Sequence, residues 1–189
     1  MAARLNPALT YLYLAETGRA PVFLALGYID PGEPPTLVWY SAELEVLRTR
    51  SGRLVGLSGA PDGPSAVRFE PGFPTWSAAL GASGAGLGFE RIWDFPLRYR
   101  FGQVDRVQMS AVAWQQVPPE LLRHVRSSLG SSAYSQWQWF QESSTLMPSA
   151  WFAVALVAGQ PQVVYSYQCL SPQRCFHLAP WPIAQIQLP

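Results

Sequence analysis

The sequence predicts a mostly β protein, either an antiparallel β-sandwich or a partially open barrel, with one short helix near residues 118–129. Short apolar and aromatic runs recur at a spacing of roughly ten residues, separated by glycine- and proline-rich stretches that are typical of turns. Pro118-Pro119 begins the one segment with a clear helical stripe, formed by Leu121, Leu122 and Val125. The 189 residues are expected to form a single domain, 1–189, with a glycine-rich connector near 81–88.

The first half of the chain reads as strands and turns. The clearest part is a hairpin around Ser51-Gly52, because glycine accepts the positive φ that a tight hairpin turn needs. If Arg53 beside this turn is only solvated, Arg53→Ala is expected to be milder than Gly52→Val. Strands are expected within 5–18, over 22–28, on both sides of the turn in 37–57, and over 66–69.

The second half continues the pattern on both sides of the helix. Leu97, Tyr99 and Phe101 alternate with two arginines, which predicts a strand through 97–101. Further strands are expected over 89–101, 104–117, 134–142, 151–157, 162–170 and 176–188, with a hairpin turn after 157.

Composition excludes several classes of protein. Charged residues make up 13% of the chain and aromatic residues another 13%, which argues against disorder. The net charge of +1 gives no field that would attract nucleic acid. All basic residues are arginine, which reflects either a GC-rich genome or anion recognition through guanidinium groups. No run of 18 apolar residues predicts a membrane span.

Cys169 and Cys175 flank a proline turn, and we predict a disulfide between them; two free thiols and, least of all, a metal site are the alternatives. No metal ligand set and no cofactor is predicted. Catalytic patterns are equally weak. His124 is expected on the surface of its helix, and Glu43 and Glu45 lie among exposed charges. An enzyme is therefore the less favoured class.

An aromatic-rich region offers the best candidate for a binding surface. The simplest explanation of this region is core packing, because such rings bury large areas. The alternative is a sugar-stacking platform with glutamines as hydrogen-bonding groups. Trp137 and Trp139 are two apart and would share one strand face, while Gln136 and Gln138 face the other way, so we favour burial of the rings. The candidate ligand-binding residues are Trp137, Trp139, Gln136, Gln138, Trp151, Tyr165 and Gln168.

The central hairpin also carries a resemblance. Trp39, Ser41 and Ala42, then Leu47, Thr49, Arg50, Gly52, Arg53, Leu54 and Val55, follow the pattern of a tryptophan-led strand and a glycine turn. Val164, Tyr165, Ser166, Gln168 and Pro172 match a closing pattern. In these residues the chain resembles the YjbF/GfcB family of group 4 capsule and exopolysaccharide lipoproteins. It departs from that family's pattern where Ser51 replaces the usual Asn and Glu43 the usual Asp.

The resemblance implies a non-enzymatic envelope protein that assists capsule or exopolysaccharide assembly or export. A carbohydrate-binding module, a periplasmic enzyme acting on polysaccharide and a scaffold that contacts other assembly proteins remain alternatives. The expected partners are other polysaccharide-assembly proteins of the envelope, and polysaccharide itself. Residues 1–4 lack the apolar region of a signal peptide, so the protein is either cytoplasmic or begins after a removed signal. The resemblance favours the second, with a periplasmic protein held at the outer membrane by a lipidated cysteine upstream.

Overall fold

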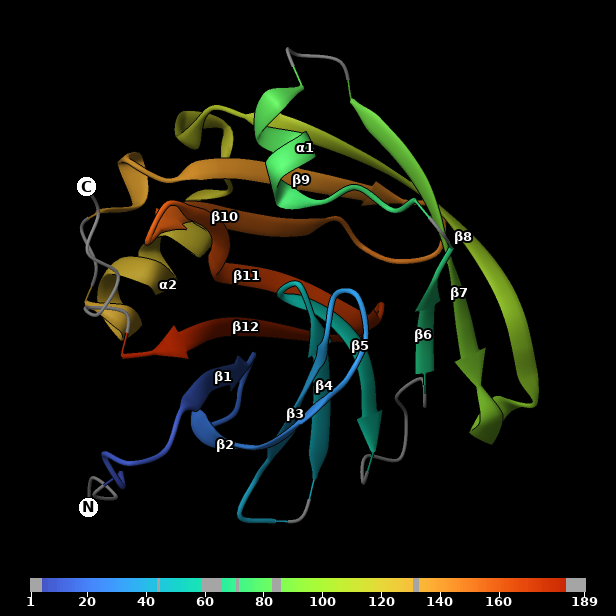
Figure 1. Ribbon diagram of the computed structural model, residues 1–189, viewed down its shortest axis with the longest axis horizontal. Coiled ribbons are helices and arrows are strands. Elements are labelled where there is room, and N and C mark those ends of the chain that lie inside the picture. The colour runs from blue at the N-terminus through green and yellow to red at the C-terminus, as the bar shows by residue number, and fades with distance from the viewer. Residues whose placement is uncertain are drawn as a thin grey trace.

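The computed structural model describes residues 5–43, 45–58, 66–70, 72–82, 86–130 and 133–182. In this part of the chain, one antiparallel sheet of 12 strands runs in the order β5-β4-β3-β2-β1-β12-β11-β10-β9-β8-β7-β6. The sheet curls until its two edge strands, β5 and β6, lie beside each other without pairing (Figure 1). Of the two predicted alternatives, the fold is therefore the partially open barrel.

The sheet consists of two meanders in which neighbours in the chain are neighbours in the sheet. The first comprises β1 Tyr11–Glu16, β2 Val22–Asp30, β3 Thr36–Tyr40, β4 Val46–Arg50 and β5 Arg53–Ser58. The second comprises β6 Ala66–Phe69, β7 Leu87–Phe95, β8 Arg100–Val112, β9 Gln138–Ser144, β10 Ala150–Val157, β11 Gln160–Ser171 and β12 Arg174–Trp181. The two meanders join where β1 pairs with β12, from Tyr11 opposite Trp181 to Glu16 opposite Phe176.

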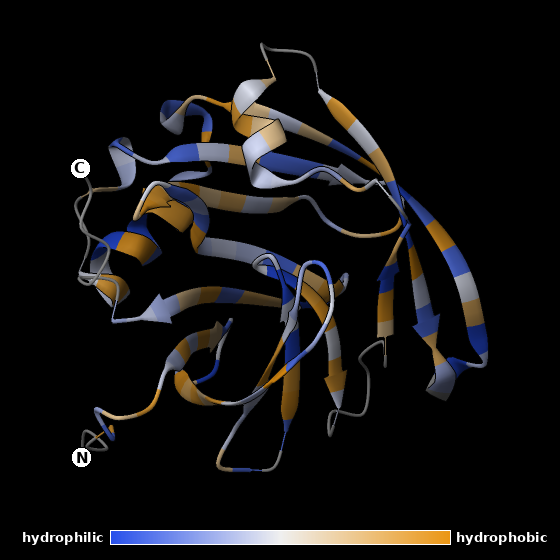
Figure 2. Cartoon of the chain, in the orientation of Figure 1, coloured by the Kyte–Doolittle hydropathy of each residue, from blue (hydrophilic) through white to orange (hydrophobic). Residues whose placement is uncertain are grey.

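Side chains on successive positions of a strand point to opposite faces of the sheet, and both faces are partly buried here. On β1 and β12, Leu12 and Leu178 belong to the core inside the barrel, whereas Tyr13 and Ala179 belong to a core on the outer face. Figure 2 shows the same alternation as bands of colour along β7 and β8. The inner core is formed by Leu12, Leu24, Trp39, Leu47, Leu54, Leu57, Val67, Trp93, Leu170, Phe176 and Leu178.

The outer core exists because a helix covers it. Helix α2, Pro119–Leu129, begins with proline at a position where the missing N–H costs nothing, and ends at Gly130 with φ of 64°. Its residues Leu121, Val125 and Leu129 are buried against the outer face of the sheet. This confirms the predicted helix near 118–129.

A second, shorter helix was not expected from the sequence. Helix α1, Trp76–Gly81, is capped by Thr75, whose side-chain oxygen accepts a hydrogen bond from the N–H of Ala78 at 3.2 Å. Trp76 packs against two phenylalanines of the strands, at ring-centroid distances of 5.6 and 5.1 Å. Of the predicted connector near 81–88, Gly81 belongs to this helix and β7 begins at Leu87, while residues 83–85 lie outside the described part.

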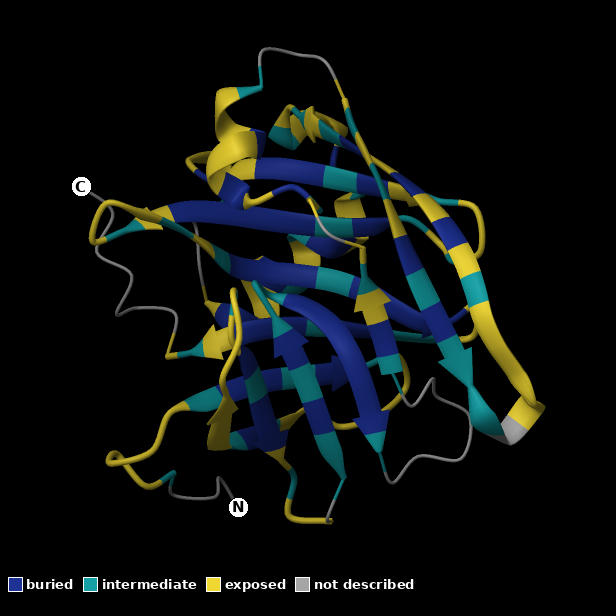
Figure 3. Ribbon diagram, turned by 45° about the vertical axis from the view of Figure 1, so that its right-hand side comes forward, coloured by how far each residue is buried: buried dark blue, intermediate teal, exposed yellow. Residues whose placement is uncertain are grey.

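The predicted strand through 97–101 is wrong for residues 97–99, whereas residues 100 and 101 begin β8. Proline has no N–H for a β-ladder, and a 3₁₀ turn, Pro96–Arg98, ends β7, with Tyr99 at φ of 49° before β8 begins. The β7–β8 pair therefore forms a long hairpin whose far end is exposed, in contrast to the buried middle of β10 and β11 (Figure 3). Within the described residues, no helix has the length and apolar character needed to cross a membrane.

Candidate functional site

The predicted aromatic residues come together on the outer face of the sheet, beneath α2. Trp137, Trp139 and Tyr165 are 5%, 0% and 0% exposed, and Trp151 packs against the same cluster. β9 begins only at Gln138, so Trp137 precedes the strand, yet its ring lies 6.2 Å from that of Trp139. The rings of Trp137, Trp139 and Tyr165 fill the space between the helix and the sheet, and so have no free face on which a sugar could stack.

The predicted glutamines do not join them. Gln136 and Gln138 are exposed, whereas Gln168 is buried on the inner face. Its side-chain oxygen accepts a hydrogen bond from the N–H of Leu54 at 2.9 Å, and its amide nitrogen donates to Gly52 O and Ser166 Oγ, both at 2.8 Å. Gln168 therefore fastens the β4–β5 hairpin to β11, and the predicted ligand-binding residues do not form one surface.

The structure contains the tight turn that the sequence predicts at Ser51-Gly52, and it pairs the two cysteines. Ser51 and Gly52 have φ of 48° and 75°, as a tight hairpin turn requires. A Cβ at Gly52 would lie 2.5 Å from the side chain of Val163, so the turn packs directly on β11. Cys169 and Cys175 face each other on β11 and β12 and form a disulfide, which decides between the three alternatives.

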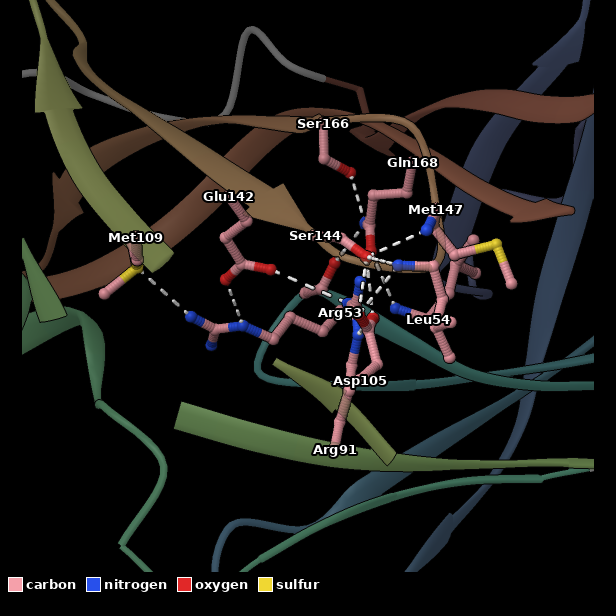
Figure 4. Close-up of polar contacts among 12 residues, drawn as sticks. Arg53, Leu54, Arg91, Asp105, Met109, Glu142, Ser144, Met147, Ser166 and Gln168 are labelled. Carbon is pink, nitrogen blue, oxygen red and sulfur yellow. Dashed lines mark hydrogen bonds and ion pairs between the residues drawn. The ribbon is translucent and has the colours of Figure 1, made fainter. Parts of the chain in front are cut away.

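Arg53 is not solvated, because it begins β5 and points into the barrel (Figure 4). Its Nε donates to Glu142 Oε1 at 2.8 Å, and the two side chains are 1% and 0% exposed. The guanidinium carbon also lies 4.0 Å from the centre of the Trp76 ring, a distance typical of a cation–π contact. The sequence does not reveal this pairing, since the two residues are 89 positions apart.

A second ion pair adjoins the first. Arg91 Nε donates to Asp105 Oδ2 at 2.8 Å, and Arg91 Nη1 lies 3.8 Å from Glu142 Oε2, which links the two pairs. Asp105 also accepts hydrogen bonds from Trp93 Nε1, from Ser144 Oγ and from the N–H groups of the two residues after Ser144. Burial alone would raise the pKa of Asp105, but the Arg91 charge and these hydrogen bonds outweigh it and lower the pKa.

Both buried acids are paired with arginine, and the lowered pKa of Asp105 keeps that carboxylate ionised. A general acid in a glycosidase needs a raised pKa and access to substrate. Asp105 has a lowered pKa, both acids are 0% exposed, and neither lines any of the three cavities described below. Only Arg53 Nη1 and Glu142 Oε2 lack a hydrogen-bond partner among the buried side-chain atoms of the described residues. The arrangement joins β5, β7, β8 and β9 inside the barrel.

An apolar cavity of about 480 Å³ lies between the β4–β5 turn, β3, β11 and β12. It adjoins the ion pairs at Trp76, whose ring lines the cavity and contacts Arg53. Gly52 and Ser166 line this cavity and also accept the two hydrogen bonds that the Gln168 amide donates. The two tryptophans in its wall use their indole N–H groups elsewhere. Trp39 Nε1 donates to Thr49 Oγ1 at 2.9 Å, and Trp76 Nε1 donates to Ser51 O at 2.8 Å.

His124 was expected on the surface of its helix, but it lies between α2 and the sheet, where its ring contacts that of His177. The rings of His124 on α2 and His177 on β12 stack at a centroid distance of 3.7 Å and an angle of 13°. The hydroxyl of Tyr13 lies 3.3 Å from His124 Nε2, and that of Tyr165 lies 2.7 Å from His177 Nδ1. Burial lowers the pKa of both imidazoles, and the neighbouring His124 contributes to the shift at His177, whose pKa falls to about 4. Both rings are therefore neutral at neutral pH.

Ligands for a metal ion do not gather in the described part of the chain, where no group of three histidine, cysteine, aspartate or glutamate side chains has suitable geometry. The histidine pair offers two nitrogen atoms at most, and its stacked rings do not converge on one point. The cysteines are already joined to each other.

Comparisons with known proteins bear on the fold. No protein-family model matches the chain, and no curated protein does. Among solved structures, the crystal structure of the hypothetical lipoprotein YmcC from Escherichia coli (K12) is similar, with a TM-score of 0.62 and 17% sequence identity. The match covers 92% of this chain and 83% of that one. At this level of identity, the comparison shows that the two proteins share the partially open barrel.

Proposed function

We propose that this protein is a non-enzymatic envelope protein of the lipoprotein type that assists the assembly or export of capsule or exopolysaccharide. The observation that carries the proposal is the barrel itself, which extends over 92% of the chain in common with a hypothetical lipoprotein. The residues on which the sequence resemblance rests support it. Trp39, Thr49, Arg53 and Gln168 all lie inside the barrel and hold its strands together.

A role without catalysis is supported by the state of the acidic side chains. Asp105 and Glu142 are enclosed and paired with arginine. A smaller cavity of about 240 Å³ does contain three glutamates, but Arg174 lies between two of them, 3.1 Å from Glu16 and 3.8 Å from Glu45. Glu16 and Glu45 therefore form ion pairs, which is the ordinary role of charges at a surface.

The disulfide supports an envelope location. Disulfides persist in oxidising compartments such as the bacterial periplasm and are rare in the cytosol. The Cys169–Cys175 bond would form once the chain has left the cytoplasm. In the proposed setting, a lipid on an upstream cysteine anchors the precursor to the outer membrane, and the barrel contacts other polysaccharide-assembly proteins on the periplasmic side.

Sugar binding through the tryptophans is the weaker explanation. Trp137 and Trp139 are enclosed beneath α2, and the glutamines that would complete the platform lie on other faces. A carbohydrate-binding module needs exposed ring faces, because stacking of a sugar requires direct contact with the ring.

The test is deletion of the gene in its host and measurement of surface polysaccharide, with the wild-type gene restored as the control. We expect less polysaccharide at the surface and unchanged length of the polymer that remains. A deletion that leaves surface polysaccharide unchanged would refute the proposal. A changed polymer length, or shortening of purified polysaccharide by the purified protein, would instead indicate an enzyme.

A further inference from the structure

We propose that the 480 Å³ cavity at the β4–β5 end of the barrel binds a linear alkyl chain, such as the acyl tail of a lipid. The inference rests on the cavity alone and does not depend on the proposed role in polysaccharide export. A volume of this size lies within the range of roughly 300–1,000 Å³ that is usual for small-molecule sites.

The apolar, uncharged side chains that line the cavity favour an apolar ligand. Leu12, Leu37, Val163 and Leu178 line the cavity together with prolines of the β2–β3 loop and of β11, and none of its lining residues is charged. Two other cavities differ, since one is lined by Glu90 and Arg106 and the second by three glutamates and two arginines. An anionic sugar or a phosphate would find no counter-charge in the apolar cavity.

Neutral sugars are also poorly matched, because each buried hydroxyl needs a hydrogen-bond partner. The indole N–H groups of Trp39 and Trp76 are already used within the protein. Ser166 already accepts a hydrogen bond from the Gln168 amide, and Gln162 lies at the exposed rim. The wall therefore offers much apolar surface and few free polar groups, which suits a chain of methylene groups.

The size of the cavity predicts a chain-length limit. If each methylene takes about the 30 Å³ that a water molecule occupies, the cavity has room for about 12–16 carbons. Each methylene buried from water should tighten binding about fourfold until that limit is reached. A longer chain would extend into water and gain little.

The experiment uses the purified, disulfide-intact protein and the fluorescent probe 1-N-phenylnaphthylamine. Saturated fatty acids from 8 to 18 carbons are then tested as competitors, and lysophosphatidylcholine with a 14-carbon tail tests whether the head group matters. We expect displacement to improve about fourfold per methylene from 8 to 12 carbons and to level off by about 16. Equal displacement by both head groups at equal tail length would assign recognition to the tail. No displacement, or no dependence on chain length, would overturn the proposal.

Two variants of Leu37, which is only partly buried, test whether the alkyl chain binds in this cavity. Leu37→Trp fills the cavity, and Leu37→Asn introduces an amide without adding volume. Both are expected to weaken binding at least tenfold, while Leu9→Trp, at a 47% exposed leucine outside the cavity, leaves it unchanged. Folding of each variant is checked by its denaturant midpoint. Unchanged binding in a folded Leu37 variant would show that the chain binds elsewhere and would refute the assignment. Export of polysaccharide is measured separately in the host, so the two proposals fail independently.

Discussion

Replacing Arg53 by methionine tests whether the enclosed ion pair holds the barrel together. Methionine keeps most of the apolar stem and removes the guanidinium group, so the change isolates the charge. The substitution breaks the 2.8 Å hydrogen bond to Glu142 and leaves a carboxylate that is 0% exposed. Removing one member of a buried pair costs about 3–5 kcal/mol, because the other charge is left without its partner in a poorly solvated place.

The magnitude can be refined from the surroundings. Glu142 retains Arg91, whose Nη1 lies 3.8 Å from Oε2, so Arg53→Met should cost about 3 kcal/mol, at the lower end of that range. Glu142→Gln leaves Arg53 without an anion and should cost about 3–5 kcal/mol. The double variant leaves neither charge, and its cost should fall below the sum of the single costs by at least about 2 kcal/mol.

The assay is equilibrium unfolding in urea, followed by tryptophan fluorescence. With a slope of about 2 kcal/mol per molar urea, Arg53→Met should lower the midpoint by about 1.5 M. Arg106→Met is the matched control, because Arg106 Nε also bonds a glutamate oxygen, Oε1 of Glu90, at 3.1 Å, but with side chains 79% and 47% exposed. That change should cost less than about 1 kcal/mol. A midpoint for Arg53→Met that matches this control would refute the argument.

Three further predictions concern the turn, the histidines and the aromatic core. Gly52→Val should destabilise the fold by about 2–4 kcal/mol, because it combines positive φ with a clash against Val163. The control Gly159→Val has φ of 76° and no atom within 4 Å of the added Cβ, so it should cost only about 1–2 kcal/mol. Equal denaturant midpoints for the two variants would show that the clash contributes nothing. The pKa of His177 is lowered to about 4 in the folded protein, so between pH 6.5 and 4 the unfolded chain binds a proton there and the folded chain does not. The contribution of His177 to stability is therefore complete above pH 6.5 and falls as the pH drops toward 4. The loss should be about 2 kcal/mol after allowance for partial exposure, and His177→Gln should flatten the midpoint across that window; a wild-type midpoint that does not change there would contradict the shift. Trp139→Ala should cost about 3–5 kcal/mol, because its ring is 0% exposed, whereas normal stability with loss of polysaccharide binding would restore the sugar platform.

Local signals in the sequence were sufficient for the parts of the structure that depend on neighbours in the chain. The Ser51-Gly52 turn, the start of α2 at Pro119 and the short span between the two cysteines each involve residues a few positions apart. The strands could be predicted because alternation of apolar and polar residues is a property of each strand by itself.

Partners distant in the chain could not be predicted. Arg53 follows a turn, where an arginine is usually solvated, and nothing near it indicates that Glu142 lies opposite. Gln168 looked like a hydrogen-bonding group for a sugar, yet its partners are the backbone of the β4–β5 hairpin. Helix α1 has only six residues, and its one local signal is the capping Thr75. The break in the predicted strand at Pro96 could have been recognised from the missing N–H of proline.

Among the described strands, the first and the last, β1 and β12, pair in the middle of the sheet, which has a consequence for the order of folding. In the first meander each strand pairs with its neighbour in the chain across a connection of a few residues, so these contacts form quickly. The pairing of β1 with β12 joins segments from opposite ends of the chain, and it cannot form until synthesis has delivered the last strand. Until then β1 carries an unpaired edge, of the kind that recruits other chains and starts aggregation. A chaperone that holds the first meander until β12 arrives would therefore raise the yield of folded protein more than one that acts on the finished barrel.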